Sequence, residues 1–231
     1  MINEHVFGRF KGLFGNRSFH WLVATVLVQM GAIQPTFLKV LPVTNGFFLA
    51  WARAAETRIT YKDFYFPLPP VALLVEGTLP NLFVNPQLAE QYIQAAKWLA
   101  VSAVLFLIIR KFASSAPVSF VASTLALTAY LTSPGNITAG YLELAWLFIL
   151  CAVLFAIKSF EAEIRVLHTL LFGMSVSLAC LTKQSALAPA FVMLVTYGVL
   201  ITKSRSWKKR KTGHLSLAIG LAVPNVLFIL W

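Results

Sequence analysis

Seven long apolar stretches, separated by short polar connections, dominate the sequence. A helix that crosses the hydrocarbon core of a bilayer needs about 20 mostly apolar residues, and each stretch reaches or approaches that length. The stretches cover residues 21–38, 88–109, 112–131, 139–157, 166–182, 184–202 and 215–231. The pattern predicts an all-α, polytopic membrane helix bundle of about seven transmembrane helices, with an N-terminal arm over residues 1–20 and a membrane domain over residues 21–231.

The amino-acid composition leads to the same class. Of the 231 residues, 58% are apolar and 12% are charged, and the mean hydropathy is +0.77. A soluble domain is about 45–50% apolar and about 25% charged, so the composition excludes an ordinary soluble enzyme and a disordered tail. Cys151 and Cys180 lie inside apolar stretches. We expect both to be free thiols, because no disulfide framework or metal-ligand spacing surrounds them.

Basic residues are concentrated in every second connection, which would lie on the side of the N terminus. These connections hold Arg110 and Lys111, then Lys158 and Arg165, and then the basic loop of residues 203–214. Lys and Arg are enriched in cytoplasmic loops, so the pattern predicts a cytoplasmic N terminus and a cytoplasmic arm. The net charge of +11 then reflects topology. For the basic run of residues 203–211, an anionic leaflet is a better partner than nucleic acid.

The connection between the first two stretches, residues 43–87, is the longest and falls on the outer side. Within residues 45–58, the aromatic side chains of Phe47, Phe48 and Trp51 share one helical face. This pattern is typical of a helix that lies in the interface plane. Prolines interrupt the next apolar stretch, residues 64–84, which is therefore expected not to cross the membrane. Long ordered loops tend to be functional, so an outer site should involve this loop.

Three charged residues on the predicted outer side are candidates for chemistry. Glu143 lies just inside the outer end of the fourth stretch, where an ionisable side chain usually faces a cavity or a partner; the alternative is a carboxylate solvated at the headgroup level. Asp63 lies among aromatic residues in the outer loop and could bind a sugar or simply form a turn. Lys183, at the outer end of the fifth stretch, could hold a lipid phosphate or extend to the interface.

Three sequence segments together resemble one family. They are Asn45-Gly46-Phe47-Phe48-Leu49 followed by Arg53, Tyr61-Lys62-Asp63-Phe64 and Pro69-Pro70; Gly140-Tyr141-Leu142-Glu143-Leu144; and Leu178-Ala179-Cys180-Leu181-Thr182-Lys183-Gln184-Ser185-Ala186. In order, spacing and side of the membrane they are similar to motifs of the GT-C type glycosyltransferases, in particular the branch of the protein O-mannosyltransferases and aminoarabinose transferases. The resemblance covers about residues 20–205.

The resemblance implies an enzyme of the bacterial inner membrane that transfers a sugar from a polyprenyl-phosphate donor to an acceptor at the outer face. A carboxylate serves as general base or holds a divalent metal, and basic groups stabilise the departing phosphate. The implied catalytic residues are Asp63 and Glu143. The implied substrate-binding residues are Arg53, Tyr61, Tyr141, Lys183 and Gln184. Membrane lipids and the lipid-linked sugar would be the partners, and nucleic acid would not.

Two departures from the family pattern favour an alternative. Thr44 and Asn45 occupy the place of the first acidic pair, and neither side chain can act as a general base at neutral pH. Family members also continue with further spans and usually a soluble domain, so we expect this chain to correspond to the N-terminal membrane module. The alternative is a catalytically inactive protein with the same fold that serves as a structural subunit of a larger membrane complex. A small transporter is disfavoured, because no inverted repeats or broken helices are apparent.

Overall fold

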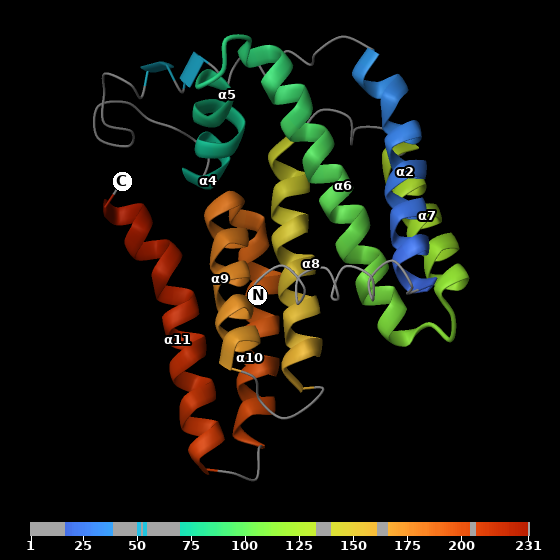
Figure 1. Ribbon diagram of the computed structural model, residues 1–231. Helices are drawn as coiled ribbons and strands as arrows, with labels where there is room; N and C mark the ends of the chain where they lie inside the picture. Colours follow the sequence, from blue (N-terminus) through green and yellow to red (C-terminus); the bar gives the residue numbers. More distant parts are fainter. Residues whose placement is uncertain are drawn as a thin grey trace, which may run out of the picture. The chain divides into compact units, whose positions relative to one another are not determined.

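The described part of this computed structural model consists of helices and their short connections (Figure 1). It covers residues 17–38, 50–51, 53–54, 70–132, 140–160, 166–203 and 207–230. The helical elements are α2 (Arg17–Leu38), α4 (Pro70–Leu73), η1 (Leu74–Thr78), α5 (Leu79–Asn81), α6 (Pro86–Phe112), α7 (Ala116–Thr132), α8 (Gly140–Phe160), α9 (Val166–Thr182), η3 (Gln184–Ala186), α10 (Leu187–Thr202) and α11 (Trp207–Leu230). The predicted all-α class is confirmed.

Four helices in this part of the chain are long and apolar enough to cross a membrane. They cover Leu88–Phe112, Glu143–Phe160, Gln184–Thr202 and Lys209–Leu230. Two shorter apolar helices cover Ala116–Ala129 and Val166–Thr182, and α2 coincides with the first predicted stretch. Each of the seven apolar stretches therefore contains a helix, and the four candidate spans indicate a multi-pass membrane protein.

The start of α11 differs from the sequence-based expectation. The basic loop was expected to extend to residue 214, whereas α11 already begins at Trp207. Lys and Arg are good helix formers, and no proline lies between Trp207 and the first apolar turn. The basic residues Lys208–Lys211 therefore form the beginning of the helix. Similarly, residues 17–20 of the predicted N-terminal arm belong to α2.

The chain divides into two compact units. Unit 1 comprises residues 1–40 and 98–137, and α2 packs along α7 within it. The rings of Trp21 and Phe120 lie 5.3 Å apart, and the Gln29 side chain donates a hydrogen bond to the Thr124 carbonyl oxygen at 3.5 Å. The Arg110 side chain donates to the Ser18 hydroxyl at 3.3 Å, which joins the C-terminal end of α6 to the start of α2.

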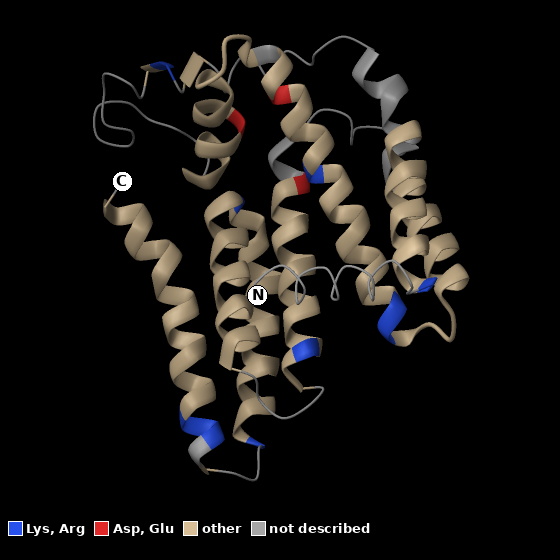
Figure 2. Ribbon diagram, in the orientation of Figure 1, with Lys and Arg blue, Asp and Glu red and all other residues tan. Residues whose placement is uncertain are grey.

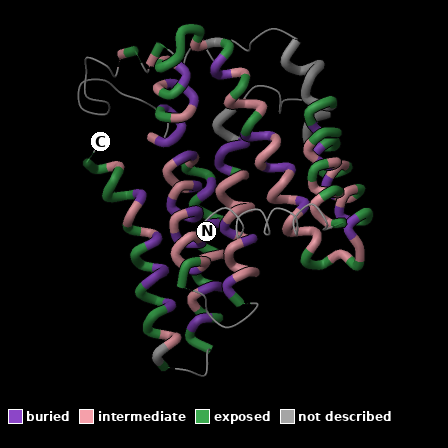
Figure 3. Tube along the Cα trace, viewed as in Figure 1, coloured by how far each residue is buried: buried purple, intermediate pink, exposed green. Residues whose placement is uncertain are grey.

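Unit 2 comprises residues 41–97 and 138–231, and α9 is its central helix. Helices α8 and α11 pack along α9, and α4 and α10 contact it as well. Buried residues recur along both α8 and α9 (Figure 3). The Tyr197 hydroxyl of α10 lies 2.6 Å from the Ser159 hydroxyl and 2.8 Å from the Thr169 hydroxyl. The Phe172 ring stacks on Tyr197 with 4.1 Å between centroids. The Tyr197 ring is therefore packed in the core, and its hydroxyl has hydrogen-bond partners there.

Helices α9 and α11 approach each other most closely at Gly173 and Gly220. A Cβ atom added to Gly173 would lie 2.8 Å from the Leu217 carbonyl oxygen, and one added to Gly220 would overlap the Leu170 carbonyl oxygen. Small residues permit this close backbone approach in membrane helix pairs. Further along α11, the Asn225 amide donates a hydrogen bond to the Ser177 hydroxyl of α9 at 2.8 Å.

The proline-rich segment between α2 and α6 contains a helical stretch at residues 70–81. Residues 70–81 form α4, η1 and α5 in direct succession. At 1.5 Å per residue this stretch is about 18 Å long, which is too short for a hydrocarbon core of about 30 Å. Pro80 has no N–H to donate, and a π-helical turn precedes it, in which the Leu79 N–H bonds to the Leu74 carbonyl oxygen. Of the predicted interfacial helix over residues 45–58, residues 50, 51, 53 and 54 are described, and they are helical.

Candidate functional site

All three acidic residues in the described part of the chain are buried, and all belong to unit 2. The side chains of Glu76 and Glu90 are 1% exposed and that of Glu143 is 4% exposed. Glutamate is rarely fully buried unless it is paired. The acids lie on η1, on the first part of α6 and on the first turn of α8 (Figure 2). The candidate site is therefore the group of polar side chains around these three carboxylates.

Glu76 is the best-satisfied of the three acids. Its Oε1 forms an ion pair with the Lys97 ammonium, and its Oε2 accepts a hydrogen bond from the Gln94 side chain at 2.7 Å. Lys97 is itself only 5% exposed. Glu90, Gln94 and Lys97 follow the spacing i, i+4 and i+7, which places them on one face of α6. The π-helical turn η1 presents Glu76 to this face, and such turns occur frequently at functional sites.

Glu90 has electrostatic neighbours, but among the described residues neither of its carboxylate oxygens has a hydrogen-bond partner. Its carboxylate is repelled by Glu76 and attracted by Lys97. A buried carboxylate without a donor is unfavourable. Its oxygens are therefore available as acceptors within the polar group.

Glu143 lies in the first turn of α8, where the helix dipole stabilises negative charge. Its Oε2 atom is buried and has no hydrogen-bond partner among the described residues. Its carboxylate is attracted by the charges of Lys97 and Lys183 and repelled by that of Glu76.

Lys183 occupies the tight connection between α9 and η3. Its backbone is extended, with φ −151° and ψ 128°, and interrupts the helical path. Two hydrogen bonds of 3.0 Å close the turn, from the Lys183 N–H to the Ala179 carbonyl and from the Ala186 N–H to the Lys183 carbonyl. The half-buried Lys183 side chain interacts with Glu143 across the packed pair α8 and α9. Glu143 and Lys183 are therefore electrostatic neighbours in unit 2.

Two other residues of the predicted site, Arg53 and Gln184, are exposed. Arg53 is helical, and Gln184 stands at the start of η3. Asp63 and Tyr61 lie outside the described residues, as does the side chain of Tyr141. The convergence of Asp63 with Glu143 accordingly stays a prediction.

Sequence analysis did not single out Glu76, Glu90, Gln94 and Lys97 as candidates, although Glu76, Glu90 and Lys97 are buried. The available signal was the spacing of Glu90, Gln94 and Lys97 along one face of an otherwise apolar stretch. Glu76 could not be found in this way, because its approach to α6 depends on the helical stretch at residues 70–81.

The arrangement is suited to removing a proton from a substrate group that lies next to a bound anion. The unbonded oxygen of Glu143 can accept a proton, and Lys183 supplies a positive charge close to it. Within the described ranges, no three His, Cys, Asp or Glu side chains form a group that could hold a metal ion.

The ion pair of Glu76 and Lys97 leads to a stability prediction. We expect Lys97→Met to destabilise the protein by about 3–5 kcal/mol, because it leaves a buried carboxylate without its counter-ion. The double variant Lys97→Met/Glu76→Leu should recover most of this loss, since apolar residues of similar volume often replace a buried ion pair at little cost. Thermal unfolding in detergent measures both. A double variant as unstable as the single one would contradict the pairing.

Comparison with protein-family models, with curated proteins and with solved structures found no match to this chain.

Proposed function

We propose that the protein is a membrane-embedded glycosyltransferase module of the GT-C type, which transfers a sugar from a polyprenyl-phosphate donor to an acceptor at the outer face of the bacterial inner membrane. The single observation that carries the proposal is the buried Glu143, with an unbonded oxygen and with Lys183 as its electrostatic neighbour. The motif resemblance includes both residues. The proposed topology has seven spans, a cytoplasmic N terminus and an outer loop with an interfacial helix.

The proposed reaction uses these two side chains in different roles. Oε2 of Glu143 accepts the proton of the acceptor hydroxyl while the hydroxyl oxygen forms a bond to the anomeric carbon of the sugar. The bond between that carbon and the phosphate oxygen breaks, and its electron pair stays on the phosphate of the departing lipid. The ammonium group of Lys183 stabilises this growing negative charge. The products are the glycosylated acceptor and polyprenyl phosphate.

A second candidate function is a structural subunit of a membrane complex. The ion pair of Glu76 with Lys97 and the hydrogen bond from Gln94 favour it, because they satisfy a buried acid within the chain without any substrate. The replacement of the family's acidic pair by Thr44 and Asn45 favours it as well.

Release of polyprenyl phosphate distinguishes the two functions, because every transfer from such a donor yields this product whatever the sugar. The purified protein in liposomes would receive polyprenyl-phosphate-linked hexoses together with a membrane extract as the source of acceptor. An enzyme releases polyprenyl phosphate above the rate of protein-free liposomes. A protein that neither releases nor binds polyprenyl phosphate is the structural subunit.

A further inference from the structure

The beginning of α11 carries several positive charges that do not stabilise the helix. Lys208–Lys211 lie in its first two turns, and its first turn holds no acidic residue. The helix dipole is positive at this end, so each cation costs roughly 0.3–1 kcal/mol where an acid would be favourable. The acids of the described residues, Glu76, Glu90 and Glu143, lie at other elements. These charges therefore favour an anionic partner.

Trp207, Arg210 and Lys211 give this basic end a defined geometry. The Trp207 side chain is 72% exposed, and the Arg210 guanidinium lies 5.2 Å from the centroid of its ring. The buried Nε of Arg210 has no acceptor among the described residues, and Lys211 is exposed. A guanidinium fork matches the oxygens of a phosphate, and the cation–π contact with Trp207 restrains the Arg210 side chain.

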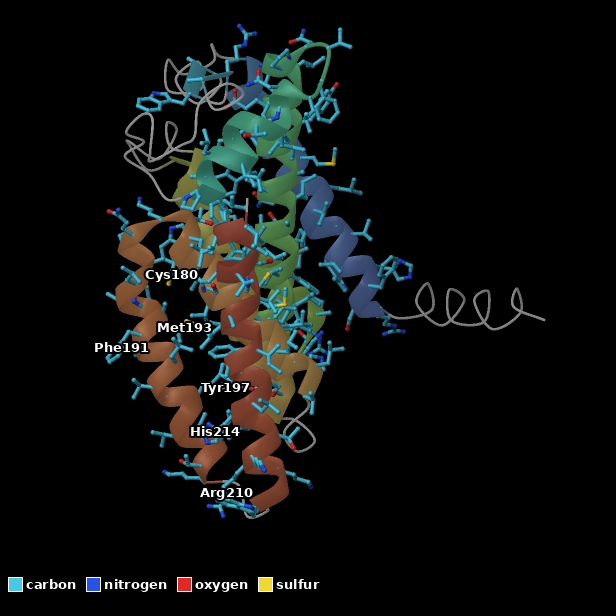
Figure 4. The ribbon with its side chains drawn as sticks, turned by 90° about the vertical axis from the view of Figure 1, so that its left-hand side faces the viewer. Cys180, Phe191, Met193, Tyr197, Arg210 and His214 are labelled. Carbon is cyan, nitrogen blue, oxygen red and sulfur yellow. The ribbon has the colours of Figure 1, made fainter. Side chains whose placement is uncertain are left out.

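The position of this group along α11 corresponds to the level of lipid headgroups. Figure 4 shows Arg210 at the end of the helix, with His214 one turn further along. From the next turn on, α11 exposes large apolar side chains such as Leu215 and Ile219, which suit the hydrocarbon region. Tryptophan concentrates where these two regions meet. The basic group thus lies where the apolar surface of α11 ends.

We propose that Trp207, Arg210 and Lys211 form a binding site for the phosphate of an anionic phospholipid. Arg210 and Lys211 hold the phosphate oxygens, and the Trp207 indole packs against the glycerol and upper acyl region of the same lipid. The site is discrete, so it goes beyond the general attraction between basic loops and an anionic leaflet. A nucleic acid fits less well, because a duplex would have to approach in the plane that the lipid headgroups occupy.

The test is native mass spectrometry of the delipidated protein in mild detergent, titrated with phosphatidylglycerol or phosphatidylcholine at equal concentration. The wild-type protein should retain phosphatidylglycerol in preference by at least about tenfold. Arg210→Gln/Lys211→Gln should reduce the preference to about parity. The matched control is Lys158→Gln/Lys203→Gln, which removes the same charge from the C-terminal ends of α8 and α10 and should keep the preference.

Several outcomes would overturn the proposal. An unchanged preference in Arg210→Gln/Lys211→Gln would remove these residues from lipid binding. An equal loss in the control would show a diffuse field of positive charge and no discrete site. Displacement of phosphatidylglycerol by millimolar inorganic phosphate would indicate a site for free phosphate. Displacement by a duplex oligonucleotide at a lower concentration than the lipid would indicate nucleic acid.

Discussion

Glu143→Gln is expected to lower the release of polyprenyl phosphate from a sugar-linked donor by at least about a hundredfold, the usual scale for losing a general base. Glutamine retains the size and the first-turn position of Glu143 but cannot accept the hydroxyl proton. The amide also removes the negative charge that interacts with Lys97 and Lys183. The rate with saturating donor should therefore fall, and thermal unfolding should show that the protein stays folded.

Glu161→Gln is the matched control, because it makes the same chemical change in a connection that the charge pattern assigns to the opposite side of the membrane. It should release polyprenyl phosphate at the wild-type rate. If Glu143→Gln retains a rate within about threefold of the wild type, Glu143 is not the base. If neither the wild type nor any variant shows turnover, the structural subunit is the better account.

Gly220→Ala is expected to destabilise the protein, because it obstructs the packing of α11 against α9. The added Cβ would overlap the Leu170 carbonyl oxygen and would also meet Gly173, so the obstacles are backbone atoms of α9. Overpacking a well-packed core costs about 1–3 kcal/mol. Because the neighbouring atoms here belong to the backbone and cannot move easily, we expect a cost at or above the upper end of this range. A lowering of the melting temperature in detergent, by roughly 10 °C, is the expected measurement.

Gly198→Ala is the control for this substitution. Gly198 also lies inside a helix, α10, but a Cβ there meets nothing within 4 Å. Removing a helix-interior glycine usually stabilises by about 0.5–1 kcal/mol, so this variant should melt at or slightly above the wild-type temperature. If both substitutions destabilised the protein equally, the loss at Gly220 could not be attributed to the close approach of α9 and α11.

The helices were predictable because apolar length alone identifies them. The fifth stretch, residues 166–182, coincides with α9, since Lys183 and the polar turn leave no ambiguity about its end. The same criterion placed the start of α11 too late, because a basic run lowers hydropathy without interrupting helix formation. It gave no helix at residues 70–81, where Pro70 stands at the start of α4 and a π-helical turn precedes Pro80.

The candidate site was predictable only where topology determined the neighbours. Glu143 and Lys183 lie at adjoining ends of sequential helices, and such helices usually pack together; this expectation is confirmed for α8 and α9. Lys97 was missed because a single lysine in an apolar stretch gives no sign of its partner. Its ion pair with Glu76 joins two helices through a contact that depends on tertiary structure.

Photo-crosslinking of a diazirine-bearing polyprenyl phosphate, followed by mass spectrometry of the labelled peptides, tests the central claim most directly. The probe is the product common to all the proposed transfers, so the result does not depend on the identity of the sugar. The proposed function predicts labelling next to Lys183 and at the first turn of α8, and loss of this labelling in Lys183→Gln. Labelling confined to residues 203–211, or labelling that Lys183→Gln leaves unchanged, would contradict it.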